Sequence, residues 1–420
     1  MGAIAPQTGG SGQTLEPSRG DAAGDAAAAA EPSWREGLGY CLRVFVAVRL
    51  GLFLLGLLGP SLLVLQPSVD VPGWTAPDPS SGWHQAVVAW ERADAAWFLR
   101  IASSGYSPDD GSPAFFPLFP MLVHGMGVLV GGRWLLAGFL VANAALLGAM
   151  VLLYRLTRME WSASMARRTV LFMAIFPTSF YLFSPFTEPL FLLCAVGALL
   201  AARRGAWWWA ALAGAGAAAT RSIGIVLVGV LAVEALHQLL QARRDGASWR
   251  PGRVAGVAAA CVAPTLGTLS YLAYWQLHTG SWRVPFNAQG GWSRTLRWPW
   301  DTLRRGIDMG TDNLGIFSGG YWTIDLLFLA LAVAAGVWLL RRTRPAYSVY
   351  LWASILFPLL FSFDSRPLMS FPRFATMIFP LYWAIAALAE RRNADALLVG
   401  LSTGGLVLLG VLSISYLPMF

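Results

Sequence analysis

Residues 90–106 place charged side chains among aromatic ones, between a long apolar run and a segment rich in Pro and Phe. Asp94 lies in this stretch and is followed by Trp97 and Phe98. A carboxylate within hydrogen-bond reach of a hydroxyl can take its proton, and desolvation by apolar neighbours raises the pKa of a carboxylate. Asp94 is therefore predicted to do the chemistry as a general base. The alternatives are an acid in a solvated loop and a helix N-cap.

Glu91 lies about one helical turn before Asp94. It is the alternative base, although the pattern favours a surface charge. Other charged residues interrupt the apolar sequence at the ends of apolar runs; they are Glu188, Arg221, Asp325, Asp364, Arg366 and Arg373. Charges at the ends of membrane-length apolar runs could hold a lipid phosphate, with its tail in hydrocarbon and its headgroup in water.

The composition indicates what kind of molecule positions these residues. The 420 residues are 56% hydrophobic and only 12% charged, against about 25% charged in a soluble domain. Apolar runs of about 20 residues recur from residue 40 onward, which predicts an all-α polytopic membrane protein. The net charge of +8 comes from arginine clusters between apolar runs, so it indicates orientation in the membrane rather than a nucleic-acid partner.

About 11 spans are predicted, near residues 40–66, 134–156, 169–184, 187–202, 206–220, 222–241, 254–277, 320–340, 346–363, 372–389 and 395–416. The run 114–130 is interpreted as a re-entrant or interfacial helix, because the arginine clusters then all fall on one face. The positive-inside rule makes that face cytoplasmic, together with the N-terminus. The opposite, extracytoplasmic face receives two long loops, 67–133 with interfacial helices and 278–319.

The rest of the chain is predicted to carry little chemistry of its own. Residues 1–33 have the composition of a disordered tail and lack the features of a cleavable signal peptide, so residues 34–420 form the single membrane domain. The cysteines fall inside apolar runs and serve as packing residues. Histidines and cysteines show no metal-ligand spacing, so no metal or other cofactor is expected; the pair Asp109 and Asp110 is interpreted as a solvated turn. Few ionisable residues lie at mid-span, which argues against an ion-coupled transporter.

Six segments, in order, resemble motifs of the PIG-V family. Asp94–Tyr106 with Phe115–Pro120 is similar to its first extracytoplasmic loop. Phe176–Phe180 with Ser184–Glu188 is similar to its Phe-Pro…Tyr-Thr-Glu signature. Thr220–Gly224 and Ser370–Phe374 resemble its Thr-Arg-x-x-Gly turn and its late Pro-Arg-Tyr motif. The chain departs from the family at Ala93, Phe98 and Phe374, where the family has Trp, Tyr and Tyr.

The resemblance implies a GT-C-type polytopic glycosyltransferase that uses a polyprenyl-phosphate-linked sugar, with mannose as the expected sugar and an acidic residue of the first loop, here Asp94, as base. The Ala-, Arg- and Gly-rich composition indicates a bacterial member, and bacteria generally lack GPI anchors, so the lipid, glycan or protein acceptor is not carried over. The expected location is the cell membrane, with the site extracytoplasmic and membrane lipids as neighbours.

This chemistry assigns roles to further residues. A departing phosphate needs positive charge, and arginine contacts phosphate oxygens in pairs. Arg221, Arg373 and Arg294 are predicted to bind the donor phosphate. The alternative for Arg221 and Arg373 is a snorkelling anchor at the interface. Glu188 is predicted to orient an arginine or to bind sugar hydroxyls, or else to be a helix N-terminal acid.

The remaining predicted substrate contacts are an amide and two aromatic residues. Gln289 lies in a loop, residues 286–300, whose amides suit hydroxyls and whose aromatic faces suit sugar rings; an interfacial aromatic belt has the same composition. Trp97 and Tyr106 contact either the substrate or only their own loop. The alternative function is a lipid-linked sugar transporter or flippase without catalysis, which would need a polar path through the bilayer. A catalytically silent scaffold is the third hypothesis.

Overall fold

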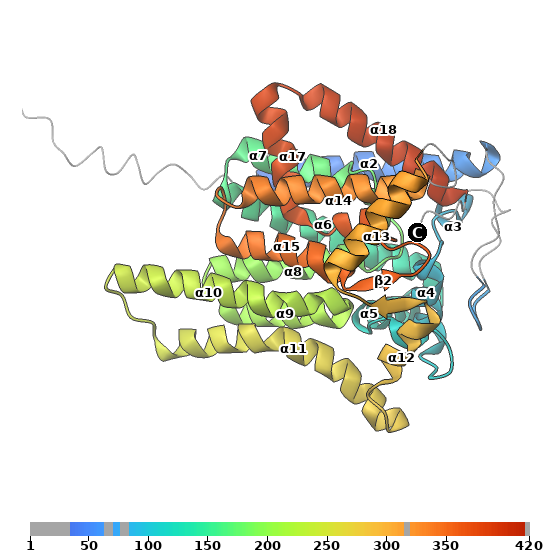
Figure 1. The fold of residues 1–420 in the computed structure, drawn as a ribbon, viewed down its shortest axis with the longest axis horizontal. Helices are drawn as coiled ribbons and strands as arrows, with labels where there is room; N and C mark the ends of the chain where they lie inside the picture. Colours follow the sequence, from blue (N-terminus) through green and yellow to red (C-terminus); the bar gives the residue numbers. More distant parts are fainter. Residues whose placement is uncertain (1–33, 63–69, 76–83, 315–319, 416–420) are drawn as a thin grey trace, which may run out of the picture.

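The computed structural model describes residues 34–62, 70–75, 84–314 and 320–415, so the predicted tail lies outside it. The described chain is mainly helical (Figure 1). Its helices are α2 (Trp34–Leu62), α3 (Gln85–Val88), α4 (Asp94–Ser104), η2 (Ser112–Ala114), α5 (Leu118–Leu129), α6 (Trp134–Glu160), α7 (Ala163–Ala174), η3 (Ser179–Leu182), α8 (Glu188–Arg203), α9 (Trp207–Thr220), η4 (Ser222–Val226), α10 (Leu227–Arg244), α11 (Pro251–Thr279), α12 (Val284–Gly291), α13 (Pro299–Asp312), α14 (Gly320–Leu339), α15 (Pro345–Leu359), α16 (Phe371–Ala375), α17 (Phe379–Arg392) and α18 (Asp395–Ile414). Two strands, β1 (Arg294–Leu296) and β2 (Phe361–Phe363), complete it.

Several helices have the length and composition of membrane spans. Within the described residues, six qualify: Arg35–Ser61, Trp134–Glu160, Ser222–Arg244, Pro251–Thr279, Tyr321–Leu339 and Asp395–Ile414. This confirms the prediction of a multi-pass, helical membrane protein, while the count of about 11 spans stays a prediction. Helix α5, with 12 residues, is about 18 Å long. It is shorter than the hydrocarbon core of about 30 Å, as expected for a segment that does not cross.

Three predicted spans are not continuous helices. The run 169–184 is divided between α7 and η3, because Pro177 has no N–H with which to continue the helix. The run 346–363 leaves the helix after Leu359 and forms β2, and the run 372–389 is divided between α16 and α17. Composition alone predicted spans here because all three runs stay apolar across the breaks.

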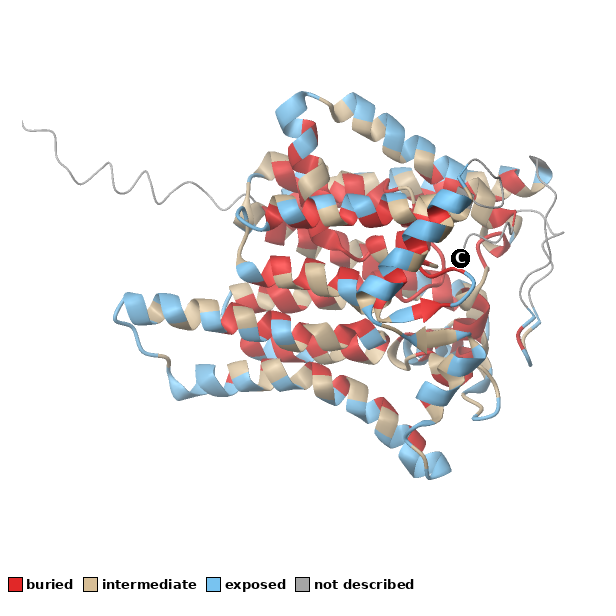
Figure 2. Cartoon of the chain, viewed as in Figure 1, coloured by how far each residue is buried: buried red, intermediate tan, exposed pale blue. Residues whose placement is uncertain are grey.

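The long helices lie roughly side by side in Figure 1, while α4, α5, α12 and β2 gather at one end. Helix α8 packs against α6 and α9, and α9 packs against α11. Figure 2 shows buried residues concentrated in these central helices and exposed residues on α11 and α18. Small residues let α9 approach α11: a Cβ on Gly267 would lie 2.3 Å from the carbonyl oxygen of Ala215. Close approach of backbones at small residues is how helices pack in membranes.

The predicted long loop 278–319 holds α12, β1 and α13. Strand β1 pairs antiparallel with β2, with Arg294 opposite Phe363. This two-stranded sheet is a departure from the all-α prediction. It brings together two segments that are far apart in the chain, and one of them carries a predicted site residue.

Candidate active site

Asp94 is the first residue of α4, and the residue before it has an unusual backbone. Ala93 has φ 49° and ψ −124°, a region that strains any residue with a Cβ. The turn between α3 and α4 thereby ends at Asp94, whose side chain is 27% exposed and lines a polar cavity. Strain of this kind persists only where the surrounding contacts hold it.

Glu188 reaches the site at the start of α8. After Pro177 ends α7, the hydroxyl of Ser179 donates to the carbonyl oxygen of Ala174 (2.7 Å), and η3 follows. Helix α8 then begins at Glu188, with Pro189 in its first turn, a position that suits proline because no helical N–H is needed there. The carboxylate of Glu188 is fully buried and lies at the positive end of the helix dipole.

Arg221 connects α9 to η4 in an extended conformation, with φ −153°. The turn folds back so tightly that a Cβ on Gly224 would lie 2.4 Å from backbone atoms of Ala217 and Ala218. The glycine of the Thr-Arg-x-x-Gly segment is thus required by close approach of the backbone. Nη1 of Arg221 donates to Thr187 Oγ1 (2.6 Å) and to Glu188 Oε1 (2.7 Å).

Arg373 lies on the short helix α16, whose backbone is held from several sides. Ser370 enters it with φ 68°, and Thr178 Oγ1 donates to the carbonyl oxygen of Pro372 (2.9 Å). Upstream, Arg366 contacts both carboxylate oxygens of Asp325 on α14, at 2.6 and 2.9 Å. These contacts fix the direction from which Arg373 enters the site.

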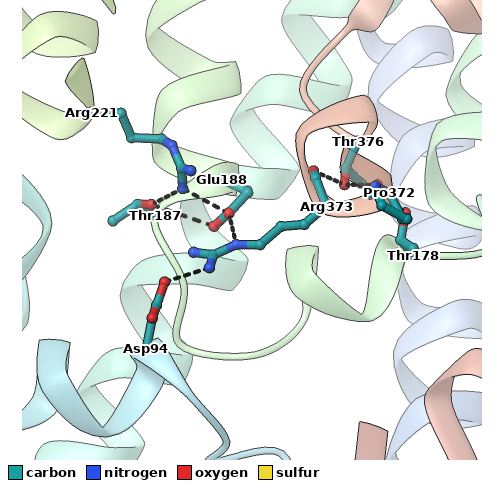
Figure 3. Close-up of polar contacts among 8 residues, drawn as sticks. All are labelled: Asp94, Thr178, Thr187, Glu188, Arg221, Pro372, Arg373 and Thr376. Carbon is teal, nitrogen blue, oxygen red and sulfur yellow. Dashed lines mark hydrogen bonds and ion pairs between the residues drawn. The ribbon is translucent and has the colours of Figure 1, made fainter. Parts of the chain in front are cut away.

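The side chain of Arg373 joins the two carboxylates. Its Nη1 donates to Asp94 Oδ2 and its Nε donates to Glu188 Oε1. Figure 3 shows Arg373 between Asp94 and Glu188, with Arg221 on the far side of Glu188. The guanidinium carbon also lies 4.6 Å from the ring centroid of Phe186, a cation–π distance. The structure therefore places Glu188 where it orients two arginines, one of the roles that the sequence left open.

The electrostatics of Asp94 differ from the expectation. Burial raises the pKa of the Asp94 carboxyl, but the ion pair with Arg373 and the charges of Arg294 and Arg221 outweigh burial and hold the pKa below its ordinary value. The predicted rise by desolvation was therefore wrong in sign. The aromatic neighbours desolvate the carboxylate, but the neighbouring guanidinium groups favour its charged form.

Arg294 faces the same cavity from β1. Its Nη1 donates to Gln289 Oε1 (3.3 Å), and its guanidinium carbon lies 4.9 Å from the ring centroid of Phe363. Its Nε has no hydrogen-bond partner among the described residues, and no carboxylate within the described chain forms an ion pair with it. Burial lowers the pKa of Arg294 to about 10, so the group stays charged at neutral pH.

Two adjoining cavities meet at these residues. The polar cavity, about 100 Å³, is lined by Asp94, Phe98, Ala114, Phe115, Phe116, Thr187, Thr220, Arg221, Ser222, Gln289, Trp292, Arg294, Arg373 and Phe374. The second cavity, about 310 Å³, is mainly apolar, with Ile223, Ile225, Leu272, Phe286, Phe357 and Phe361 among its lining residues. Arg221, Gln289 and Arg294 line both. Two arginines therefore lie at the junction of a polar space and an apolar one, and Ala114, Phe116, Ser222 and Phe374 share that junction with them.

Two predicted substrate residues lie elsewhere. The indole of Trp97 stacks on Phe115, with ring centroids 5.7 Å apart. The hydroxyl of Tyr106 donates to the carbonyl oxygen of Phe115 (2.9 Å). Neither residue lines either cavity. Their contacts are those of loop packing, and they support Phe115, which does line the polar cavity.

Glu91 is not the surface charge that the pattern favoured. It is 2% exposed, and one of its carboxylate oxygens accepts from the indole N–H of Trp74. Burial raises the pKa of Glu91 to about 7. Glu91 does not line either cavity, so the geometry does not favour it as the base. The prediction failed because Trp74 comes from a preceding segment that no local pattern connects to Glu91.

The structure adds site residues that sequence reasoning did not single out. Thr187 lines the polar cavity and binds Arg221, while Tyr181 and Phe186 place their rings against the guanidinium of Arg373. Thr187 and Phe186 belong to the segment Ser184–Glu188 that was noted as a motif, but only the fold shows what they touch. Among the described residues, no group of three or more His, Cys, Asp or Glu side chains could hold a metal ion.

Comparisons with known proteins bear on the same segments. Residues 42–247, which hold Asp94, Glu188 and Arg221, match the family model described as Mannosyltransferase (PIG-V). The match is to the family whose motifs the sequence resembles, and it covers the first five of the six segments that carry that resemblance, as far as Gly224. No curated protein sequence matches the chain.

Solved structures with similarity include the oligosaccharyltransferase of Archaeoglobus fulgidus. Its crystal structure with Zn and sulfate is 16% identical, with a TM-score of 0.44, over 89% of this chain and 53% of that one. Its apo form is 12% identical, with a TM-score of 0.46, over 90% of this chain and 56% of that one. AglB from the same organism, in complex with an inhibitory peptide and a dolichol-phosphate, is 14% identical, with a TM-score of 0.43, over 90% of this chain and 56% of that one. The chain spans about half the length of these solved proteins.

Proposed function

We propose that this protein is a GT-C-type membrane glycosyltransferase that transfers a sugar from a polyprenyl-phosphate carrier to an acceptor hydroxyl. The observation that carries the proposal is one cavity wall on which a carboxylate, Asp94, lies among Arg221, Arg294 and Arg373. The similarity of residues 42–247 to the PIG-V mannosyltransferase family supports mannose as the sugar.

The charges of the site favour an anionic ligand. Three guanidinium groups, from Arg221, Arg294 and Arg373, lie with only two carboxylates, from Asp94 and Glu188. Arg294 is the one without a carboxylate partner among the described residues, and a buried unpaired charge is costly. A phosphate oxygen at Arg294 and Arg221 would supply the missing negative charge in the geometry that arginine prefers.

The adjoining apolar cavity supports a lipid-linked donor. It adjoins the polar cavity at a set of shared residues that includes Arg221, Gln289 and Arg294, and its further lining is largely Phe, Ile and Leu. A polyprenyl phosphate has its polarity change at the same point, between phosphate and hydrocarbon. With the phosphate at the arginines, the first isoprene units would lie in the apolar cavity and the sugar would face Asp94.

In the proposed reaction the acceptor hydroxyl oxygen attacks the anomeric carbon of the sugar. The bond from that carbon to the phosphate oxygen breaks, and its electron pair stays on the lipid phosphate, which the arginines stabilise. The hydroxyl proton passes to Asp94. Glu188 is committed to Arg221 and Arg373, so it is not free to act as a nucleophile, and we infer inversion at the anomeric carbon. No cofactor is needed.

The arginine distribution supports an orientation. Arg243 and Arg244 end α10, and Arg341 and Arg342 follow α14; in Figure 1 these helix ends lie at the opposite end of the molecule from α4, which begins at Asp94. We infer that those ends are cytoplasmic and that the site opens to the extracytoplasmic side of the cell membrane, where a membrane-embedded carrier can reach it.

Sugar transfer by purified protein in liposomes tests the proposal. The assay supplies radiolabelled polyprenyl-phosphate mannose and a lipid extract of the native host, and compares wild type with Asp94→Asn. We expect labelled product from the wild type and a loss of about a hundredfold in the variant, the scale of general-base catalysis. Glu160→Gln is the matched control, because Glu160 is also paired with an arginine (2.5 Å) but does not line either cavity.

Equal product from wild type and Asp94→Asn would exclude Asp94 as the base. No product, with movement of the labelled headgroup across the bilayer instead, would favour the flippase. Binding of the lipid without either outcome would favour the silent scaffold.

A further inference from the structure

Asp94, the proposed base, and Arg373, one of the arginines proposed to bind the donor phosphate, form an ion pair with each other in this structure. Nη1 of Arg373 donates to Asp94 Oδ2, while Nε of the same guanidinium donates to Glu188. In this state Asp94 is a neutralised counter-ion, because the charge of Arg373 lowers the tendency of the carboxylate to accept a proton. A base that is held in this way is a poor acceptor for the proton of a hydroxyl.

The two partners of this ion pair are not held equally. Arg373 is fixed at Nε by Glu188, a carboxylate with no exposed surface, and by the ring of Phe186 at 4.6 Å. Arg373 itself is 7% exposed. Asp94 keeps 27% of its side chain exposed and lines the polar cavity. When the pair separates, Asp94 is therefore the partner that is free to turn.

An anion in the polar cavity competes for Arg373. Arg221 and Arg373 both line this cavity beside Asp94, so a phosphate bound there lies within a few ångströms of the carboxylate. Two anions at that distance repel, and the phosphate also takes over part of the positive charge that neutralises Asp94. Both effects raise the proton affinity of the carboxylate.

We propose that the donor phosphate, by binding Arg373, releases Asp94 from its ion pair, so that the carboxylate becomes available as a base only when the donor is present. This inference rests on the proposed function and adds an order to it, in which donor binding comes before activation of the acceptor. An enzyme of this design does not activate a hydroxyl, including water, at an empty site.

The groups that surround Asp94 determine what a titration would report. Arg373 approaches from α16, Arg294 from β1 and Arg221 from the turn between α9 and η4; Glu188 and Tyr181 are the acidic groups next to Arg373. The arginines remain charged throughout the range of a carboxyl titration. A change in the titration midpoint of Asp94 on adding a phosphate therefore reports the new anion and the loss of the Arg373 contact.

Infrared difference spectroscopy of the full chain in detergent tests the inference. The carboxyl C=O band of Asp94, assigned by its loss in Asp94→Asn, is titrated with and without polyprenyl phosphate. Binding of the radiolabelled lipid is measured in the same sample. We expect the Asp94 midpoint to rise by about one unit or more when the lipid binds, as an opposing charge is withdrawn. The Glu91 band, outside the cavities, is the internal reference and stays in place.

Arg373→Lys is the second variant. A lysine keeps one positive charge and so spares the fold, but a single ammonium cannot bond Glu188 and Asp94 with the geometry of a guanidinium. The midpoint of Asp94 in this variant is expected to be high already without lipid and to change less on adding it. Arg203→Lys, the matched control at the other end of α8, is expected to behave as wild type.

The outcomes separate the inference from the proposed function. Lipid that binds without moving the Asp94 midpoint would overturn the release of the base and leave donor binding intact. An equal rise in wild type and Arg373→Lys would show that Arg373 does not mediate the effect, and would also overturn it. A protein that does not bind the lipid would remove the proposed donor and this inference together.

Discussion

The two ends of helix α8 each carry a group of carboxylates and arginines that is at least partly buried, but the two groups differ in charge balance. At the start of α8, Glu188 bonds Arg221 and Arg373, and Arg373 bonds Asp94; Arg294 adds a further positive charge on the cavity wall. We call these five residues the cavity-side group. Its excess positive charge faces the polar cavity.

At the far end of α8, Arg203 bonds Glu160 at 2.5 Å and lies 3.7 Å from Glu234, which Arg344 approaches to 3.3 Å. We call these four residues the far-end group. It has equal numbers of positive and negative charges, and none of its members lines either cavity described above. The comparison shows that buried ion pairs alone do not identify a site. The cavity-side group differs from the far-end group in having an uncompensated charge on a cavity wall.

The sharpest test exchanges one arginine in each group for lysine. Arg373→Lys is expected to lower sugar transfer by about a hundredfold, since one donor to a developing charge is worth about that much. Arg203→Lys is expected to leave transfer within about twofold of wild type, because distant sites act independently. Both variants retain their positive charge, and initial rates of transfer compare them. Similar losses in the two would show that the far-end group is also part of the machinery.

Glu91 is a buried carboxyl near Asp94 that lines neither cavity, and it tests what burial does to an acid outside the cavity-side group. Its pKa is raised to about 7, above the value of about 4.3 in the unfolded chain, so the free energy of unfolding falls as pH rises from about 4.3 to 7 and levels off above that. Glu91→Gln, which keeps an oxygen for Trp74, is expected to stabilise the protein by about 2 kcal/mol at pH 8 and by much less at pH 5. Thermal unfolding in detergent at the two pH values measures this. A stabilisation of equal size at both would contradict the assignment of Glu91 as a buried acid.

Arg294 tests the excess charge itself. Arg294→Gln is expected to weaken binding of polyprenyl phosphate about tenfold, because one charge-assisted contact of roughly 1.4 kcal/mol is lost. Its unfolding temperature should hold, since no ion pair is broken. Arg297→Gln is the control from the same segment, where the arginine pairs with the exposed Asp364 at 2.7 Å. Equilibrium binding of labelled lipid measures both, and equal affinities would contradict the role of Arg294.

The smallest expected effect concerns backbone strain, which is greater next to the cavity-side group than at the other end of the helices. Ala93 and Ser370, which precede Asp94 and Arg373, both have positive φ, whereas Asn393, after α17, is of a type that tolerates it. Ala93→Gly is expected to raise the free energy of unfolding by about 0.5–1 kcal/mol by relieving that strain. Ala95→Gly, inside α4, should lower it by about 1 kcal/mol. A destabilised Ala93→Gly would show that the methyl group contributes more than its strain costs.

The helical membrane architecture and several residues on the cavity wall could be predicted from the sequence, because each has a signal within a short stretch of chain. Apolar runs predict spans, and Asp94, Arg221 and Arg373 stand out as charges at their ends. Reasoning of that kind could not reach contacts between distant segments. The ion pair of Asp94 with Arg373 joins α4 to α16, and it reversed the expected direction of the Asp94 pKa. The sequence also did not predict the breaks after α7 and α15. The residues stay apolar across both breaks, so composition gives no local sign of them.

The short sheet formed by β1 and β2 has a consequence for how this fold can vary. Three residue pairs bring Arg294 beside Phe363, although α13, α14 and α15 lie between them in the chain. The position of Arg294 therefore depends on strand register and not on the length of the intervening chain. Insertions and deletions around α13 can accumulate in descendants of this protein without moving Arg294. Such a fold can change around α13 while Arg294 keeps its place on the cavity wall.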